Sequence, residues 1–153
     1  MRIADFISKE AITINIKSTT KKDIIQELVG PLVKARKLKK DAGEKAVKAL
    51  MDREKRGTTG IGQGVAIPHA KLDKIKGAVL ALGCSAKGVE FNALDGEAVH
   101  VIFLLLSSKD DKEGIHLKLL AKIARSLKDK FFRSSLKEAK TSEEALSFIE
   151  REE

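Results

Sequence analysis

The sequence predicts an α/β fold, a three-layer α/β/α sandwich around a mixed, mostly parallel sheet of about five strands. Short runs of β-branched and other apolar residues alternate with longer segments whose apolar residues recur at helical spacing. One run, residues 100–106, is almost continuously apolar, as expected for a central strand that is covered on both faces. The chain has 153 residues, of which 42% are hydrophobic, so we expect a single domain over residues 1–153.

The first half of the chain predicts a strand followed by two helices. Residues 11–16 alternate apolar and polar side chains and are rich in strand formers. A helix follows with Thr20 as its N-cap, and Pro31 predicts a kink or a break into two shorter helices because proline has no N–H to donate. Asp41 is the predicted cap of the next helix.

The second half predicts the remaining strands and helices. Residues 71–76 are polar and indicate a turn, residues 78–85 indicate a buried strand, and residues 87–91 indicate a hairpin partner or an edge strand. After the strand at 100–106 and a polar loop, the pattern predicts a helix with His116 in its first turn. A short helix around residue 136 and a last helix capped by the threonine at 141 complete the chain.

The net charge of +8 has two interpretations. Lysines concentrate in residues 34–48 and 118–140, which could form an electrostatic footprint for nucleic acid or for an acidic partner. They could instead form the solvated faces of amphipathic helices. Acidic residues are interspersed among the lysines, and Trp and Tyr are absent, so solvated faces are favoured and no nucleic-acid partner is expected.

Cysteine usage and hydropathy exclude several other classes. Cys84 is the single cysteine, so an intrachain disulfide and zinc clusters of the Cys-x-x-Cys type are excluded, and a core position is expected for its thiol. The first residues lack the apolar core of a signal peptide, and no apolar run approaches the ~20 residues of a membrane span. We therefore expect a cytoplasmic protein that does not insert into a membrane.

Residues 57–70 are unlike an ordinary helix or strand, because a glycine-rich loop runs into a Pro-His step. The loop matches neither the nucleotide P-loop nor the dinucleotide-binding fingerprint. Its glycines could let the backbone approach a ligand or expose N–H groups to an anion, whereas the alternative is a flexible surface turn. The residues considered for phosphoryl binding are Gly60, Ile61, Gly62, Gly64 and Pro68.

His69, at the end of this loop, is the candidate nucleophile for carrying a phosphoryl group. Neutral imidazole is nucleophilic near neutral pH, and transfer then depends mainly on positioning and on charge stabilisation. Arg53 is the candidate cation, since its guanidinium can form a bidentate contact. Arg53 and Glu54 continue an apolar helical stripe, so they could point into a cavity shared with the loop or could simply leave the core.

The sequence indicates different roles for the other two histidines. His116 starts a helix, whose dipole favours a neutral imidazole, and it follows the end of a strand, where α/β sheets place their ligand crevices. A lone histidine is also often structural, and the sequence leaves both roles open for His116. His100 lies in or at the edge of a strand and is interpreted as structural.

The motif around His69 resembles a known active-site signature. Arg53-Glu54-Lys55, residues 57–62 and the run Val-Ala-Ile-Pro-His at 65–69 resemble enzyme IIA proteins of the phosphoenolpyruvate-dependent phosphotransferase system, in the fructose/mannitol/nitrogen-regulatory class. The resemblance extends over essentially the whole chain. It implies an α/β/α fold with a mixed sheet and a phosphocarrier that accepts a phosphoryl group from a histidine phosphocarrier protein.

The resemblance also implies roles for individual residues. The phosphorylated histidine of the family corresponds to His69, its second active-site histidine to His116 and its arginine to Arg53, while Glu54 is a weaker correspondence. No metal and no organic cofactor are implied.

Three functional alternatives remain at this point. A chain without a fused IIB domain most resembles the nitrogen-regulatory type, which regulates partner proteins according to its phosphorylation state. A separate fructose-type IIA would instead pass the phosphoryl group to a IIB domain, and a regulatory module would bind partners without being phosphorylated. Because the carrier's active-site rim is typically basic, we expect the surface around His69 to be less basic than the protein as a whole.

Overall fold

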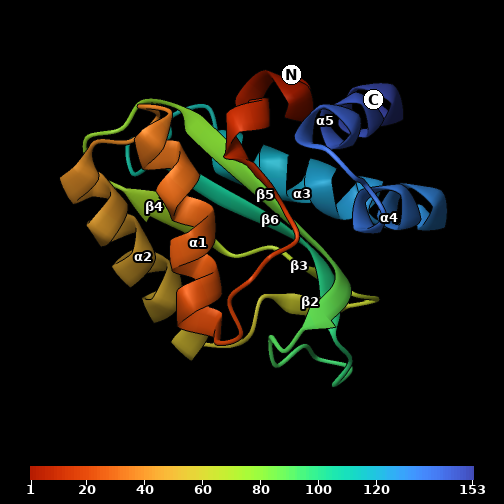
Figure 1. The fold of residues 1–153 in the computed structure, drawn as a ribbon. Coiled ribbons are helices and arrows are strands. Elements are labelled where there is room, and N and C mark those ends of the chain that lie inside the picture. The colour runs from red at the N-terminus through yellow and green to blue at the C-terminus, as the bar shows by residue number, and fades with distance from the viewer.

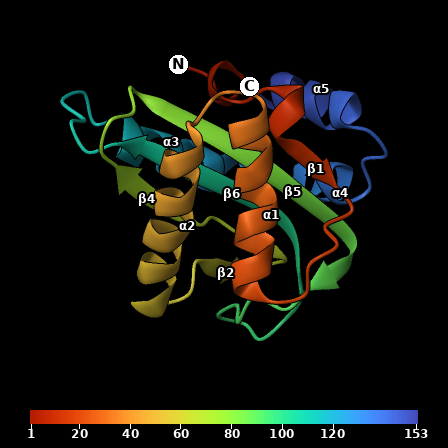
Figure 2. The same cartoon turned by 60° about the vertical axis from the view of Figure 1, so that its left-hand side comes forward.

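The computed structural model describes residues 1–153, and it shows a sheet with helices on both faces (Figure 1). The helices are α1 (Lys21–Lys34), α2 (Lys40–Lys55), α3 (Ile115–Ser126), α4 (Lys130–Lys137) and α5 (Ser142–Glu152), with short 3₁₀ turns at Ile3–Phe6 and Lys9–Ala11. The strands are β1 (Ile12–Ile14), β2 (Gly60–Gly62), β3 (Val65–Ala66), β4 (His69–Leu72), β5 (Ala78–Val89) and β6 (Val99–Ser108). Helices α1 and α2 cover one face of the sheet, while α3, α4 and α5 cover the other (Figures 1 and 2).

The sheet is mixed, and its strand order is β1-β5-β6-β3-β2, with β4 also paired to β6. Three pairings are parallel (β1 with β5, and β3 and β4 with β6), whereas β5–β6 and β2–β3 are antiparallel. The predicted three-layer α/β/α sandwich with a mixed, mostly parallel sheet is thus confirmed, with six strands in place of about five. The short strands β2, β3 and β4 lie in segments where the sequence predicts a loop and a turn.

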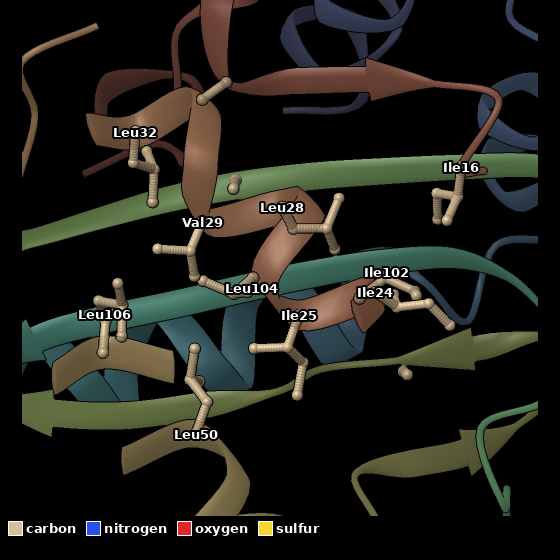
Figure 3. Close-up of a cluster of buried hydrophobic side chains, with 14 of the residues drawn as sticks. Ile16, Ile24, Ile25, Leu28, Val29, Leu32, Leu50, Ile102, Leu104 and Leu106 are labelled. Atoms are coloured by element: carbon tan, nitrogen blue, oxygen red, sulfur yellow. The ribbon is translucent and has the colours of Figure 1, made fainter. Parts of the chain in front are cut away.

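Strand β6 is the centre of the molecule and is buried on both faces, as its continuous apolar character predicts. Alternate side chains enter two separate cores. Ile102, Leu104 and Leu106 pack under α1 and α2 (Figure 3), together with Ile24, Ile25, Leu28, Val29, Leu32 and Leu50. Val101, Phe103 and Leu105 pack on the opposite side with residues of α3, α4 and α5.

Two helix predictions are wrong in detail. Helix α1 continues through Pro31 without a break, because buried leucines on both sides of the proline keep the helix on the sheet and outweigh one missing hydrogen bond. Helix α2 begins at Lys40 with Lys39 as its N-cap, so Asp41 lies in the first turn, where its negative charge faces the positive end of the helix dipole. The predicted caps Thr20 and Thr141 are confirmed, since each hydroxyl accepts a backbone N–H three residues on.

The predicted segment at 87–91 is not a separate strand. Residues up to Val89 continue β5 past an irregularity in its pairing with β6. Strand β5 is consequently longer than predicted and reaches the turn that carries residues 92–98.

Candidate functional site

A surface cavity of about 640 Å³ lies where the end of α2, strand β4 and the start of α3 meet. Figure 2 shows α2 running beside β4. The cavity is lined by Ala49, Asp52, Arg53, Arg56, His69, Ala70, Lys71 and His116. The fold therefore brings together three residues that the sequence selects from distant segments, namely His69, His116 and Arg53.

His69 is the first residue of β4, and its orientation is set by its own backbone neighbourhood. Its Nδ1 lies 2.7 Å from the carbonyl oxygen of Ile67. A carbonyl only accepts hydrogen bonds, so Nδ1 carries the proton and donates it, which leaves the lone pair of neutral imidazole on Nε2. Burial lowers the pKa of His69 and the charge of Arg53 lowers it too, whereas the hydrogen bond to Ile67 acts in the opposite direction.

Pro68 lies directly before His69, at a break in the sheet pairing. Strands β3 and β4 both pair with β6 in the same parallel direction, and the interruption between them falls at residues 67 and 68. Pro68 has no N–H to add to the ladder, although its carbonyl accepts from the N–H of Leu105 at 2.9 Å. The Pro-His step thus lies at the break between β3 and β4, next to the Ile67 carbonyl that accepts from the imidazole of His69.

His116 lies in the first turn of α3 and is buried. Its ring centroid is 5.5 Å from that of His69, in an edge-on arrangement. Its Nδ1 is hydrogen-bonded to the hydroxyl of Ser107, at the end of β6. Asp111 fixes the start of the helix, because its carboxylate accepts the backbone N–H groups of Ile115 at 2.8 Å and of His116 at 3.0 Å.

The surroundings of His116 keep it neutral. Burial is the main cause that lowers the pKa of His116 from 6.5 to about 4, and the charges of a protonated His69 and of Lys71 act in the same direction. Both imidazoles of the cavity are therefore neutral near pH 7.

These shifts predict the pH titration of the histidines. In NMR titrations of the imidazole protons, His116 should titrate with a midpoint near 4 and His69 should titrate below the usual value of 6.5. Because the unfolded chain takes up these protons at higher pH than the folded one, the free energy of unfolding should decrease as the pH falls from 6.5 towards 4. A midpoint for His116 at or above 6.5 would contradict the buried, neutral imidazole.

Arg53 reaches the cavity from the last turn of α2. Its Nη1 donates to the carbonyl oxygen of Gly57 at 2.8 Å, which holds the start of the glycine-rich loop and fixes the guanidinium. Arg56 and Lys71 also line the cavity, against one acidic residue, Asp52. The expectation that the surroundings of His69 are less basic than the whole protein is therefore wrong for the cavity, whose cations suit a doubly charged phosphoryl group.

Glu54, the neighbour of Arg53, is outside the cavity lining and is 7% exposed. It accepts hydrogen bonds from the backbone N–H of Thr59 at 3.2 Å and from the Thr59 hydroxyl, and it forms an ion pair with Lys21 at 2.9 Å. These contacts give Glu54 a structural role, and its negative charge also acts on His69, whose pKa it raises. Glu54 ties the end of α2 to the glycine-rich loop and to the start of α1.

The residues of the glycine-rich loop are not among those that line the cavity, and their part in phosphoryl binding stays a prediction. Gly60, Ile61, Gly62 and Gly64 belong to the β2–β3 hairpin and its turn, and Pro68 is buried in the sheet. A Cβ on Gly60 would come within 2.9 Å of the Ala93 backbone, and Gly64 has φ +77°, a left-handed conformation that favours glycine. These glycines serve close packing and a tight turn.

Two further residues occupy structural places, as the sequence predicts. The Nδ1 of His100 donates to the carbonyl oxygen of Ser85 at 2.8 Å, away from the cavity. Cys84 is buried in the sheet, and burial raises the pKa of its thiol to about 12.

Sequence reasoning missed Ser107, Asp111, Arg56 and Lys71 at the site. Asp111 lies three residues before the N-cap Gly114, so the usual capping pattern does not point to it. The contact between Ser107 and His116 depends on tertiary structure. No group of three or more His, Cys, Asp or Glu side chains is arranged to hold a metal ion, and none of the helices has the length and apolar character that a membrane crossing requires.

Comparison with known proteins is consistent with this geometry. Residues 5–152 match the family model "Phosphoenolpyruvate-dependent sugar phosphotransferase system, EIIA 2". The chain is 35% identical to a nitrogen regulatory protein of Bradyrhizobium diazoefficiens over 149 residues, which are 97% of this chain and 95% of that protein. It is 34% identical to the fructose-specific EIIABC component of Bacillus subtilis over 149 residues, which are 97% of this chain but 23% of that longer protein.

A solved structure supports the same family as the family model and the two relatives. The crystal structure of nitrogen regulatory protein IIA-Ntr from Neisseria meningitidis superimposes with a TM-score of 0.85 at 32% identity, covering 96% of this chain and 98% of that chain. The chain therefore belongs to the EIIA type 2 family of the phosphoenolpyruvate-dependent sugar phosphotransferase system, a family of phosphoryl-transfer components.

Proposed function

We propose that this protein is a phosphohistidine carrier in which Nε2 of His69 accepts a phosphoryl group from a histidine phosphocarrier protein. The observation that carries the proposal is the hydrogen bond from Nδ1 of His69 to the carbonyl of Ile67, which leaves Nε2 unprotonated beside a basic cavity. A neutral imidazole with its lone pair on a defined nitrogen meets the requirement for a nucleophile.

The transfer step balances without any other reactant. The lone pair of His69 Nε2 attacks phosphorus, the bond between phosphorus and the donor's imidazole nitrogen breaks, and that electron pair stays on the donor. The proton of Nδ1 remains on His69 and keeps its hydrogen bond to Ile67, whose carbonyl dipole stabilises the positive charge on the phosphorylated ring.

The cations and His116 stabilise the transferred group. Arg53, Arg56 and Lys71 supply positive charge around the equatorial phosphoryl oxygens, where charge accumulates in the transition state. In the tautomer assigned by this proposal, the hydroxyl of Ser107 donates to Nδ1 of His116, and Nε2 of His116 bears the proton that is donated to a phosphoryl oxygen.

The proposal also includes the domain that carries the function, its cellular compartment and a contact for the carrier protein. The chain acts as one domain over residues 1–153, in the cytoplasm, with no cofactor. The side chain of Leu117, which follows His116 in the sequence, is exposed and would offer an apolar contact to a docked carrier protein.

Among the family branches, we favour the nitrogen-regulatory type, in which phosphorylation of His69 alters the binding of regulated partner proteins. The match over 95% of a nitrogen regulatory protein supports this choice. The second candidate is a fructose-type IIA that donates to a separate IIB domain, which the similarity to a fructose-specific component supports.

Reconstitution tests the proposal. Incubation with phosphoenolpyruvate, enzyme I and a histidine phosphocarrier protein should place acid-labile, base-stable phosphate on the protein, because phosphohistidine hydrolyses in acid. Labelling that depends on all three components supports the carrier. No labelling, together with a stable complex with a partner protein, would instead show a regulatory module that binds without phosphorylation.

The same reaction separates the two branches. Phosphate that moves rapidly from the labelled protein to a separate IIB protein identifies the fructose type. Phosphate that stays on the protein and changes its affinity for a regulated partner identifies the nitrogen-regulatory type.

A further inference from the structure

A second cleft, of about 660 Å³, lies next to the cavity of His69. It is formed by the α1–α2 connection, the first turns of α2 and the segment that joins β4 to β5. Its lining residues are Arg36, Lys37, Leu38, Lys39, Asp41, Ala42, Lys45, Ala49, Lys71, Leu72, Asp73, Lys74, Ile75, Lys76, Val79 and Lys109. Ala49 and Lys71 line both depressions, so the two are continuous on the surface.

This cleft, hereafter the basic cleft, contains most of the excess charge of the protein. Eight of its lining residues are Lys or Arg and two are Asp, a net charge of +6. The whole chain has 30 basic and 22 acidic residues, so the remaining 22 basic residues are nearly balanced by 20 acidic ones. The net charge of +8 is thus a local property of one depression and not of solvated helix faces in general.

The cations of the basic cleft are not neutralised within the protein. The one ion pair between lining residues joins Lys109 to Asp73 at 3.5 Å, and both side chains are exposed. The lysines at 37, 39, 45, 71, 74 and 76 and Arg36 have no carboxylate within ion-pair distance. Tight turns bring them together, since Arg36 and Lys74 have the left-handed φ values of 61° and 62°. Seven like charges around one depression repel each other, and a bound polyanion would relieve this repulsion.

The floor of the basic cleft is apolar. Leu38 and Leu72 are buried in it, and Ile75 and Val79 are partly exposed. A concave site of a few hundred Å³ with an apolar floor and convergent charges has the dimensions of a small-molecule site. No aromatic side chain lines it, so it lacks the stacking platforms that single-stranded nucleic acids use.

We propose that the basic cleft binds a small anion that carries a chain of phosphate groups, either as inorganic polyphosphate or as the polyphosphate moiety of a nucleotide. Several linked phosphates can contact lysines on both walls at once, whereas a single phosphate cannot. The site is separate from the nucleophile and goes beyond the phosphocarrier function, although its occupant would lie beside Lys71.

Isothermal titration calorimetry with sodium tripolyphosphate at about 150 mM salt tests the proposal, because longer-range attraction is screened under these conditions. The variant K45Q/K76Q removes two charges from opposite walls and should weaken tripolyphosphate binding by about tenfold or more. The matched control K128Q/K130Q removes two exposed lysines from the α3–α4 region, so its net charge is identical, and it should bind like the wild type. Equal affinities for both double variants, or no binding by the wild type at millimolar tripolyphosphate, would overturn the proposal.

Two further ligands define the chemistry. A nucleoside triphosphate that binds more tightly than tripolyphosphate shows that the apolar floor contributes, while equal affinity shows that the phosphate chain alone is recognised. Both results support the proposal. Orthophosphate binding as tight as tripolyphosphate binding, or tighter binding of a single-stranded oligonucleotide, would contradict it. The variant H69A should bind tripolyphosphate normally, which distinguishes this site from the phosphocarrier function.

Discussion

Replacing His69 with alanine should reduce phosphate incorporation from phosphoenolpyruvate by at least about a thousandfold, to the background of the assay, because the substitution removes the nucleophile itself. The substitution should not unfold the protein, since His69 is only half-buried and its single hydrogen bond is to a neighbouring carbonyl. The measurement is acid-labile phosphate after incubation with enzyme I and the histidine phosphocarrier protein, with thermal unfolding as the check on folding.

The other two histidines provide matched controls. The variant H116A should still be labelled but should donate its phosphoryl group more slowly, by about a hundredfold, as expected when one donor to the transferred group is lost. The variant H100Q should be labelled at the wild-type rate, because His100 lies outside the cavity. Wild-type labelling of H69A would show that another residue accepts the phosphoryl group, and unchanged donation by H116A would make His116 structural.

Local patterns in the sequence are sufficient for much of the fold. The caps Thr20 and Thr141 act through contacts within a few residues, so they can be recognised without tertiary information. Strand β6 is recognisable because burial on both faces requires an apolar residue at almost every position. The stripe of α1 predicts its buried face, but not that packing on the sheet would keep the helix intact through Pro31.

The candidate residues of the site can be predicted from the sequence, but the contacts that hold them together cannot. His69, Arg53 and His116 stand out by type and by local context, whereas the contact of Ser107 with His116 joins the ends of two elements. The sequence cannot assign the role of the glycine-rich loop, because glycines near a ligand and glycines in a tight hairpin form the same sequence pattern. The positions of the cations along the chain likewise do not reveal that the α1–α2 connection and the β4–β5 segment enclose one cleft.

Glu54 shows how a charged residue on a helical stripe can be a buried anchor, and its replacement should have the second large effect. In E54A, the partly buried ammonium of Lys21 loses its carboxylate, and the N–H and hydroxyl of Thr59 lose their acceptor. We expect the free energy of unfolding to fall by about 3 kcal/mol, near the lower end of the range for breaking a buried pair, because Lys21 retains some solvent contact. Urea unfolding followed by circular dichroism measures this change.

Two substitutions separate charge from position. E54Q keeps an acceptor for Thr59 but removes the charge that faces Lys21, so it should cost about 1–2 kcal/mol, less than E54A. D52A breaks the exposed pair between Lys48 and Asp52 (2.8 Å) on the same helix and should change stability little.

E54A should also slow labelling of His69, because Thr59 and Gly57 connect Glu54 and Arg53 to one loop. If E54A were no less stable than D52A, the buried network would not hold the end of α2 against the loop, and the placement of Arg53 would need another cause.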